Sequence, residues 1–306
     1  MELFSFCLNF KAETELLLEK YPSIALRGGM GMSMKHTFCV MGKKKSICRD
    51  CLLAETCPYA RVFESVSLQN LSNMKKATHY PHPFAITPLF NGPISLNAGE
   101  NFAFSITIVG SAIKYLPHIV FSIEKLGAKG LGKHRGKFSL CHITNVVDGR
   151  NYNLEELTYE NGNFLPVSLE YQKVSNIVEI EFLTPCRLKK EGKTLQTIDF
   201  VDIVNHLLRK RDILESIYCT SSTKLDRTAL LQEAENIKKI EENLKWELMS
   251  RYSRRQQNLM PLEGFVGTVV FEGNMKPFAQ ILRLAELINI GKNSSFGFGA
   301  VRIRFV

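Results

Sequence analysis

The chain has 306 residues, a formal net charge of +9 at pH 7 and a pI near 9.1. This length suits two compact domains better than one, and a hydrophobic content of 45% is ordinary for a globular protein. The basic surplus favours a polyanionic partner and does not choose between nucleic acid and an anionic membrane. Since no apolar run reaches the roughly 20 residues that span a bilayer, the composition argues against a membrane-embedded protein.

The N-terminal segment predicts a strand rather than a targeting signal. Residues 1–10 lack the basic start and the small-residue cleavage site of a secretory signal peptide. We therefore expect a cytoplasmic protein with no membrane partner, whose eight cysteines are reduced or metal-bound. Phe4, Phe6, Leu8 and Phe10 alternate with other residues, which indicates a first strand with one buried face.

The next segments complete one ferredoxin-like pattern. Residues 23–39 predict a helix, with Leu26, Met30 and Met34 along one face and His36 nearly opposite. Strands are expected at 84–90, 101–110 and 138–147, and a helix at 112–126. The order strand, helix, strand, strand, helix, strand is that of a ferredoxin-like unit.

A small polar insertion at about 39–57 contains four cysteines with the spacing C-x8-C-x2-C-x5-C: Cys39, Cys48, Cys51 and Cys57. Four soft ligands so close together are enough for a tetrahedral zinc ion, and the same ligands suit an iron–sulfur cluster. Free surface thiols are the other reading. Because four thiolates leave zinc no open position for water, such a metal is structural, and we expect no catalytic metal.

The C-terminal half predicts a second unit of the same kind. Strands are expected at 174–183, 263–271 and 300–306, and helices at 200–218, 228–249 and 277–290. The polar, turn-rich stretch that begins at residue 148 marks a boundary between the halves. The fold class is therefore α+β, with tandem ferredoxin-like (RRM-like) domains at 1–155 and 156–306.

Glycine-rich basic loops precede the last strand of each half. The first contains Lys133, His134 and Arg135 between glycines. The second contains Gly291, Lys292, Ser294, Ser295, Gly297 and Gly299, and Arg302 and Arg304 follow it on the final strand. Glycine lets backbone N–H groups approach an anion, so both loops are candidate RNA-phosphate contacts. A helix C-cap followed by a tight turn explains the second loop equally well.

Three arginines between the predicted helix at 228–249 and the strand at 263–271 are further candidates for RNA binding. Arg251, Arg254 and Arg255 flank Tyr252, which suits a run of phosphates with one stacked base. The alternative is a solvated linker.

Several of these segments resemble one family. Residues 264–299 resemble the C-terminal signature of the CRISPR precursor-RNA processing endoribonucleases of the RAMP superfamily. Residues 246–264 and the block at 26–31, followed by the cysteine cluster, are similar to one branch of that family. The resemblance implies tandem ferredoxin-like domains, a CRISPR repeat RNA as substrate and subunits of a CRISPR effector complex as further partners.

The resemblance also implies metal-independent cleavage of RNA into guide RNAs, with 5′-hydroxyl and 2′,3′-cyclic phosphate ends. Family members often carry a histidine on or after the first helix, and His36 is the residue that fits. Histidine suits the required proton transfers because its unperturbed pKa is about 6.5. The alternatives are an exposed surface histidine, and for the whole chain a non-catalytic RAMP subunit or a zinc-containing RNA-binding protein outside CRISPR. For His134 we expect RNA contact without catalysis.

Overall fold

The computed structural model describes residues 1–41, 48–64, 80–90, 92–159, 163–220, 225–253 and 258–306. These residues form two compact units, one of residues 1–167 and 213–222 and the other of residues 168–212 and 223–306. The boundary that the sequence places between residues 155 and 156 stays a prediction.

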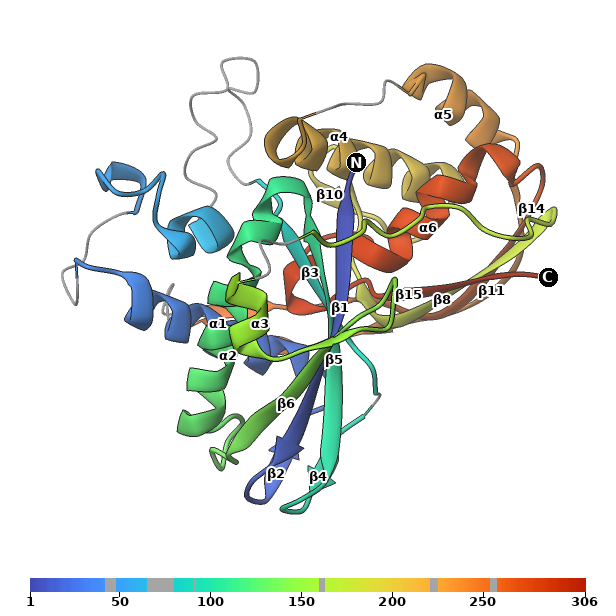
Figure 1. Ribbon diagram of the computed structural model, residues 1–306. Coiled ribbons are helices and arrows are strands. Elements are labelled where there is room, and N and C mark those ends of the chain that lie inside the picture. The colour runs from blue at the N-terminus through green and yellow to red at the C-terminus, as the bar shows by residue number, and fades with distance from the viewer. Residues whose placement is uncertain (42–47, 65–79, 91, 160–162, 221–224, 254–257) are drawn as a thin grey trace. The chain divides into compact units, whose positions relative to one another are not determined.

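Among the described residues, the N-terminal unit has five main-sheet strands, a two-stranded ribbon and three α-helices. Figure 1 shows their arrangement. They are β1 (Leu3–Ala12), β2 (Leu16–Leu18), α1 (Ser23–Phe38), β3 (Phe84–Pro88), β4 (Ile94–Leu96), β5 (Asn101–Val109), α2 (Leu116–Lys129), β6 (Phe138–Asn145), β7 (Asn151–Tyr152) and α3 (Leu154–Tyr159). Short turns of 3-10 helix lie at Cys48–Asp50 and Gly110–Tyr115, and a π-helical turn lies at Ala60–Glu64.

The main sheet of this unit has the ferredoxin-like topology that the sequence predicts. Its strand order is β3-β5-β1-β6-β7, and every neighbouring pair is antiparallel. The predicted strand with one buried face at the start of the chain is confirmed, since Phe6, Leu8 and Phe10 of β1 are almost fully buried. Helices α1 and α2 pack on each other and cover one face of the sheet (Figure 1). The expected helix at 112–126 begins as a 3-10 turn, and its α-helical part starts at Leu116.

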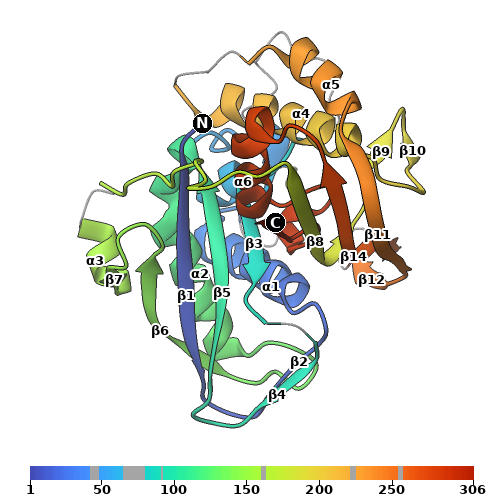
Figure 2. The same cartoon turned by 90° about the vertical axis from the view of Figure 1, so that its right-hand side faces the viewer.

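The C-terminal unit repeats the pattern with a four-stranded sheet (Figure 2). Its elements are β8 (Ile177–Cys186), β9 (Lys189–Lys190), β10 (Lys193–Thr194), α4 (Phe200–Tyr218, whose residues 213–218 belong to the first unit), α5 (Arg227–Glu235), β11 (Lys238–Glu247), β12 (Ser250–Ser253), β13 (Asn258–Pro261), β14 (Gly264–Glu272), α6 (Ala279–Ile288) and β15 (Val301–Phe305). Short 3-10 turns lie at Lys276–Phe278 and Ser294–Phe296.

Strand order in this sheet is β11-β14-β8-β15, so β8 and β15 are neighbours, just as β1 and β6 are neighbours in the N-terminal unit. Buried side chains of β8, such as Ile180 and Phe182, form one core with α4 and α6. The fold class is therefore α+β with ferredoxin-like units, as predicted.

One predicted element is wrong. The expected helix at 228–249 ends as α5 at Glu235, and Lys238–Glu247 is instead the edge strand β11, paired with β14. Glutamate and lysine favour helices in isolation, and the apolar residues of this segment mimic a helical period. Pairing with the open edge of β14 and half-burial of Leu244 and Trp246 against the core override that local preference.

Candidate active site and nucleic-acid interface

His36 lies in the last turn of α1 with its side chain exposed. Leu26, Met30 and Met34 on the opposite face of the helix are buried, as the periodicity predicts. Packing therefore fixes the helix while the imidazole stays accessible from solvent. Among the described residues, no hydrogen bond or ion pair holds the His36 ring, which leaves both ring nitrogens available for proton transfer.

The turn that carries His36 is positioned by aromatic contacts. The Lys35 ammonium lies over the ring of Tyr59, 5.4 Å from its centroid, and the Tyr59 hydroxyl donates to the Glu64 carboxylate at 2.9 Å. On the other side, Phe38 packs against His118 with ring centroids 5.0 Å apart. Burial lowers the pKa of His118, which favours its neutral form. His118 therefore acts in packing rather than as a second exposed base.

The basic turn at 130–137 is an accessible loop. A bridge between Leu131 and Gly136 closes it, and Lys133, His134 and Arg135 are exposed at its tip. No carboxylate among the described residues pairs with these three side chains. Gly29 of α1 lies against Leu126 near the end of α2, seven residues before His36. Phe38, two residues after His36, packs on His118 in the first turn of α2, whereas the turn at 130–137 follows Lys129, the last residue of that helix. His36 and the basic turn therefore lie toward opposite ends of α2.

The second half of the loop at 291–299 packs inward. Gly297, Phe298 and Gly299 are buried, and Ser295 is 5% exposed. The Gly297 carbonyl accepts a hydrogen bond from Thr184 Oγ1 at 2.7 Å, and the Gly299 N–H donates to the Pro185 carbonyl at 3.0 Å. These glycines let the loop pass close to β8. Their assignment as RNA contacts stays a prediction, and their observed neighbours are backbone and side chains of the loop's own unit.

The first half of the same loop faces solvent. Lys292 is exposed, and Asn293 and Ser294 are half-exposed. Within the described part of the chain, the backbone N–H groups of Asn293, Ser294 and Ser295 have no acceptor. Consecutive free N–H groups beside a cation form an anion-binding arrangement. The loop therefore combines a buried anchor at 297–299 with a polar, basic surface at 292–294.

Two side chains of α4 support the loop, the buried Lys210 and the half-buried His206, and neither role was predicted from the sequence. Lys210 donates hydrogen bonds from Nζ to the carbonyl oxygens of Ile288 and Asn289, where α6 ends. A cation suits this position because the C-terminus of a helix carries partial negative charge. The His206 ring makes a hydrogen bond with the backbone of Gly291. Burial lowers the pKa of Lys210 to about 7.

His206 predicts acid sensitivity of the C-terminal unit. Burial, followed by the charges of Lys210 and Lys292, lowers its pKa from 6.5 to about 3. Between these values the unfolded chain binds a proton that the folded chain does not, so the free energy of unfolding falls as pH falls from 6.5 to 3. The His206 contribution should fall by about 2.5 kcal/mol between pH 6 and pH 4. Urea unfolding of the full chain at both pH values measures it. His206→Gln should lose less stability on acidification, and an equal loss in both proteins would contradict the prediction.

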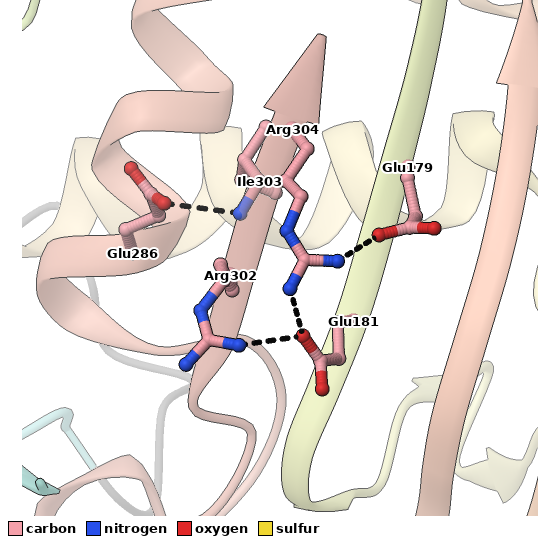
Figure 3. Close-up of polar contacts among 6 residues, drawn as sticks. All are labelled: Glu179, Glu181, Glu286, Arg302, Ile303 and Arg304. Carbon is pink, nitrogen blue, oxygen red and sulfur yellow. Dashed lines mark hydrogen bonds and ion pairs between the residues drawn. The ribbon is translucent and has the colours of Figure 1, made fainter. Parts of the chain in front are cut away.

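The arginines of β15 pair with carboxylates of the neighbouring strand (Figure 3). Arg302 donates to Glu181 at 2.9 Å, and Arg304 pairs with Glu179 and, at 3.0 Å, with Glu181. The carboxylates come from β8, the neighbouring strand in the sheet. These arginine charges are therefore compensated across the sheet, and an RNA contact by this strand stays a prediction.

The arginine cluster is described only in part. Arg251 lies in β12, which pairs with β13 as a two-stranded ribbon. Arg254 and Arg255 lie outside the described residues. The role of all three in RNA binding stays a prediction.

Comparison with known proteins decides the family. Residues 180–301 match the family model of the CRISPR-associated endoribonuclease Cas6, and residues 1–169, more than half of the chain, match that of the AF_1859_N N-terminal domain. The C-terminal part of the chain belongs to the Cas6 family of CRISPR-associated endoribonucleases. An uncharacterized protein of Archaeoglobus fulgidus is 28% identical to the chain over 284 residues, which cover 91% of this chain and 90% of the relative.

Solved Cas6 structures share the fold of this Cas6-type chain. A Cas6 product complex matches with a TM-score of 0.55 at 14% identity, over 99% of both chains. Thermus thermophilus Cas6 matches with a TM-score of 0.52 at 14% identity, over 99% of this chain and 98% of the other. A partial Cas6-RT-Cas1–Cas2 complex matches with a TM-score of 0.58 at 11% identity, over all of this chain and 46% of the other. At these identities the similarity establishes the fold.

The cysteines of the Cas6-type chain do not form a recognisable metal site. Cys39, Cys48, Cys51 and Cys57 are half-buried thiols, and burial is the main cause that raises the pKa of Cys48. Within the described ranges, no group of three or more His, Cys, Asp or Glu side chains could hold a metal ion. A structural zinc ion or an iron–sulfur cluster at these cysteines stays a prediction. The described helices also include none long and apolar enough to cross a bilayer.

Metal analysis tests the prediction for the cysteines. If they bind zinc, the purified protein holds about one metal ion per chain, and the double variant Cys48→Ser, Cys51→Ser loses both the ion and stability. Thermal unfolding and elemental analysis measure the two effects. The exposed Cys141 provides a matched control through Cys141→Ser. Unchanged metal content and unchanged unfolding of the double variant would contradict a structural metal site.

Proposed function

We propose that this chain is a metal-independent endoribonuclease that cleaves CRISPR repeat transcripts into guide RNAs. The observation that carries the proposal is the exposed His36 at the end of α1, on a helix whose opposite face is buried. Family membership supports the substrate class. An accessible histidine favours an enzyme over a non-catalytic RAMP subunit, because a subunit that only binds RNA needs no exposed proton-transfer group at this position.

The proposed reaction uses the RNA's own 2′-hydroxyl as nucleophile. A base removes the 2′-proton, the oxygen attacks the adjacent phosphorus, and an acid protonates the departing 5′-oxygen. The products are a 2′,3′-cyclic phosphate and a 5′-hydroxyl. His36 acts as the acid or the base, since an imidazole exchanges protons near neutral pH. A cation close to the reacting phosphate stabilises the charge of the transition state.

The RNA contacts proposed for this reaction lie on exposed basic loops. In the N-terminal unit they are Lys133, His134 and Arg135, none of which is neutralised by a described carboxylate. In the C-terminal unit they are Lys292 and Ser294, at the solvent-facing half of the glycine-rich loop. Contacts of this kind hold the RNA backbone, while the cut position depends on the bases or the shape of the repeat.

Product analysis in EDTA tests the proposal. Purified protein is incubated with a CRISPR repeat RNA in excess EDTA, and the product ends are identified by phosphatase treatment and mass spectrometry. We expect cleavage at one position, with 5′-hydroxyl and 2′,3′-cyclic phosphate ends. A requirement for added divalent metal, or 5′-phosphate ends, would contradict the mechanism. Intact RNA that is tightly bound would instead favour a non-catalytic subunit.

A further inference from the structure

A short basic hairpin follows the first strand of the C-terminal sheet. Strands β9 and β10 are joined at Glu191 and Gly192, whose φ angles of 51° and 83° suit the tight turn of a two-residue hairpin. The Leu195 N–H donates to the Leu188 carbonyl at 3.1 Å and closes the base of the hairpin. In Figure 2 it projects from the sheet as a separate ribbon. Its lysines, Lys189, Lys190 and Lys193, are all exposed.

The base of this hairpin adjoins the glycine-rich loop. The Lys292 N–H donates to the carbonyl oxygen of Arg187 at 3.0 Å. A Cβ at Gly291, whose φ is +82°, would lie 2.7 Å from the same oxygen, so glycine is needed for this approach. Arg209 of α4 precedes Lys210, whose Nζ donates to the carbonyl oxygens of Ile288 and Asn289 just before the loop. In agreement, the charges of Lys189, Arg187 and Arg209 add to the partial burial that lowers the pKa of Lys292. Cations from three separate elements therefore converge beside the loop.

Most of these charges lack a neutralising partner. Among the described residues, no carboxylate pairs with Lys189, Lys193, Arg209 or Lys292. Elsewhere in the unit, basic side chains are compensated: Arg302 and Arg304 pair with glutamates of β8, and Arg283 pairs with Glu286. Like charges held close together repel one another, so the uncompensated group is stabilised when an anion binds.

We propose that Lys189, Lys193, Arg209 and Lys292 form one binding surface for consecutive phosphates of the RNA backbone. This surface, the basic ridge, deepens the proposed function and rests on it. Of these four residues, only Lys292 is a candidate RNA contact from the sequence alone. A flexible polyanion with evenly spaced charges can follow cations that lie along a hairpin, a helix and a loop. Binding at the ridge should not depend on the base sequence, because lysine and arginine contacts to RNA phosphates fix the position of the RNA without recognising its bases.

Salt-dependent binding tests the ridge. The variant Lys189→Gln, Arg209→Gln removes two of its charges and changes exposed side chains only, so folding should be kept. Affinity for a labelled repeat RNA is measured from about 50 to about 300 mM KCl, where counterion release dominates the salt dependence. Each lost phosphate contact should lower the slope of log affinity against log salt by about 0.7, so we expect a decrease of about 1.4. Near 0.1 M salt this corresponds to a loss of affinity of roughly 25-fold.

The matched control removes the same number of charges elsewhere in the unit. The variant Arg302→Gln, Arg304→Gln should keep the wild-type slope, because these arginines are paired with Glu179 and Glu181. Equal losses in both variants would show a general effect of net charge and would overturn the ridge. So would an unchanged slope in the ridge variant while the wild type cuts the repeat. A wild-type protein that neither binds nor cuts repeat RNA would contradict the proposed function itself. Binding of polyglutamate that depends on the ridge, with RNA affinity unaffected, would assign it to an acidic protein and overturn the proposal.

Discussion

Replacing His36 with alanine is expected to lower the single-turnover cleavage rate about 10²- to 10⁴-fold, the usual contribution of a positioned acid or base. Affinity for the repeat RNA should stay within about twofold, because His36 serves proton transfer rather than backbone binding. The side chain is exposed, so its loss leaves no cavity and should not impair folding. Rapid-quench cleavage at saturating protein measures the rate, and filter binding measures the affinity.

A second histidine of the same unit provides the control for this prediction. His142 lies in β6, half-buried, and is assigned no role in binding or chemistry. His142→Ala should cut at a rate within about twofold of the wild type. If His36→Ala cuts normally, the assignment of His36 ends, and another group must supply the proton transfer.

Gly299→Ala is expected to destabilise the C-terminal unit by about 2–4 kcal/mol or more, the combined effect of a left-handed φ and an overpacked site. The φ of Gly299 is +67°, and a Cβ built there would lie 1.7 Å from the carbonyl oxygen of Ile290. The Ile290 oxygen belongs to the backbone, and the Ile290 N–H donates to the Gly299 carbonyl at 2.7 Å, so the two segments cannot separate without breaking that hydrogen bond. Urea unfolding of the full chain measures the effect.

Gly192 separates the two causes of this destabilisation. Its φ of +83° is equally left-handed, yet a Cβ there meets nothing within 4 Å. Gly192→Ala should therefore cost only about 1 kcal/mol, the strain of the backbone conformation alone. Equal effects at both positions would show that steric contact with Ile290 is not what requires glycine at residue 299.

Local patterns were sufficient to predict the ferredoxin-like units. Burial of one face determines these elements, and two patterns in the sequence indicate that burial. They are the alternation of Phe4, Phe6, Leu8 and Phe10 and the helical periodicity around Met30. The same reasoning placed His36 on an exposed face. It failed for Lys238–Glu247, where the partner strand β14, not local propensity, decides the structure.

The candidate RNA surface was less predictable, because its charges meet only in the folded chain. From the sequence alone, Arg302 and Arg304 are as plausible RNA contacts as Lys292. The glutamates that pair with these arginines lie more than a hundred residues earlier in the chain, so no local pattern reveals them. Nothing local to the loop shows that Arg209 and Lys189 lie beside it. The runs Lys189–Lys190 and Arg209–Arg211 were the available signals. The buried roles of His206 and Lys210 likewise depend on the end of α6.

The nucleophile can be tested directly with a repeat RNA that carries a single 2′-deoxy nucleotide at the position where the wild-type protein cuts. The substitution removes the attacking oxygen and leaves the phosphates and bases in place, so binding should be retained. We predict that this RNA binds with unchanged affinity and is not cut. Cleavage of the deoxy-substituted RNA at the same position would show that another nucleophile attacks the phosphorus, and would contradict the mechanism proposed for His36.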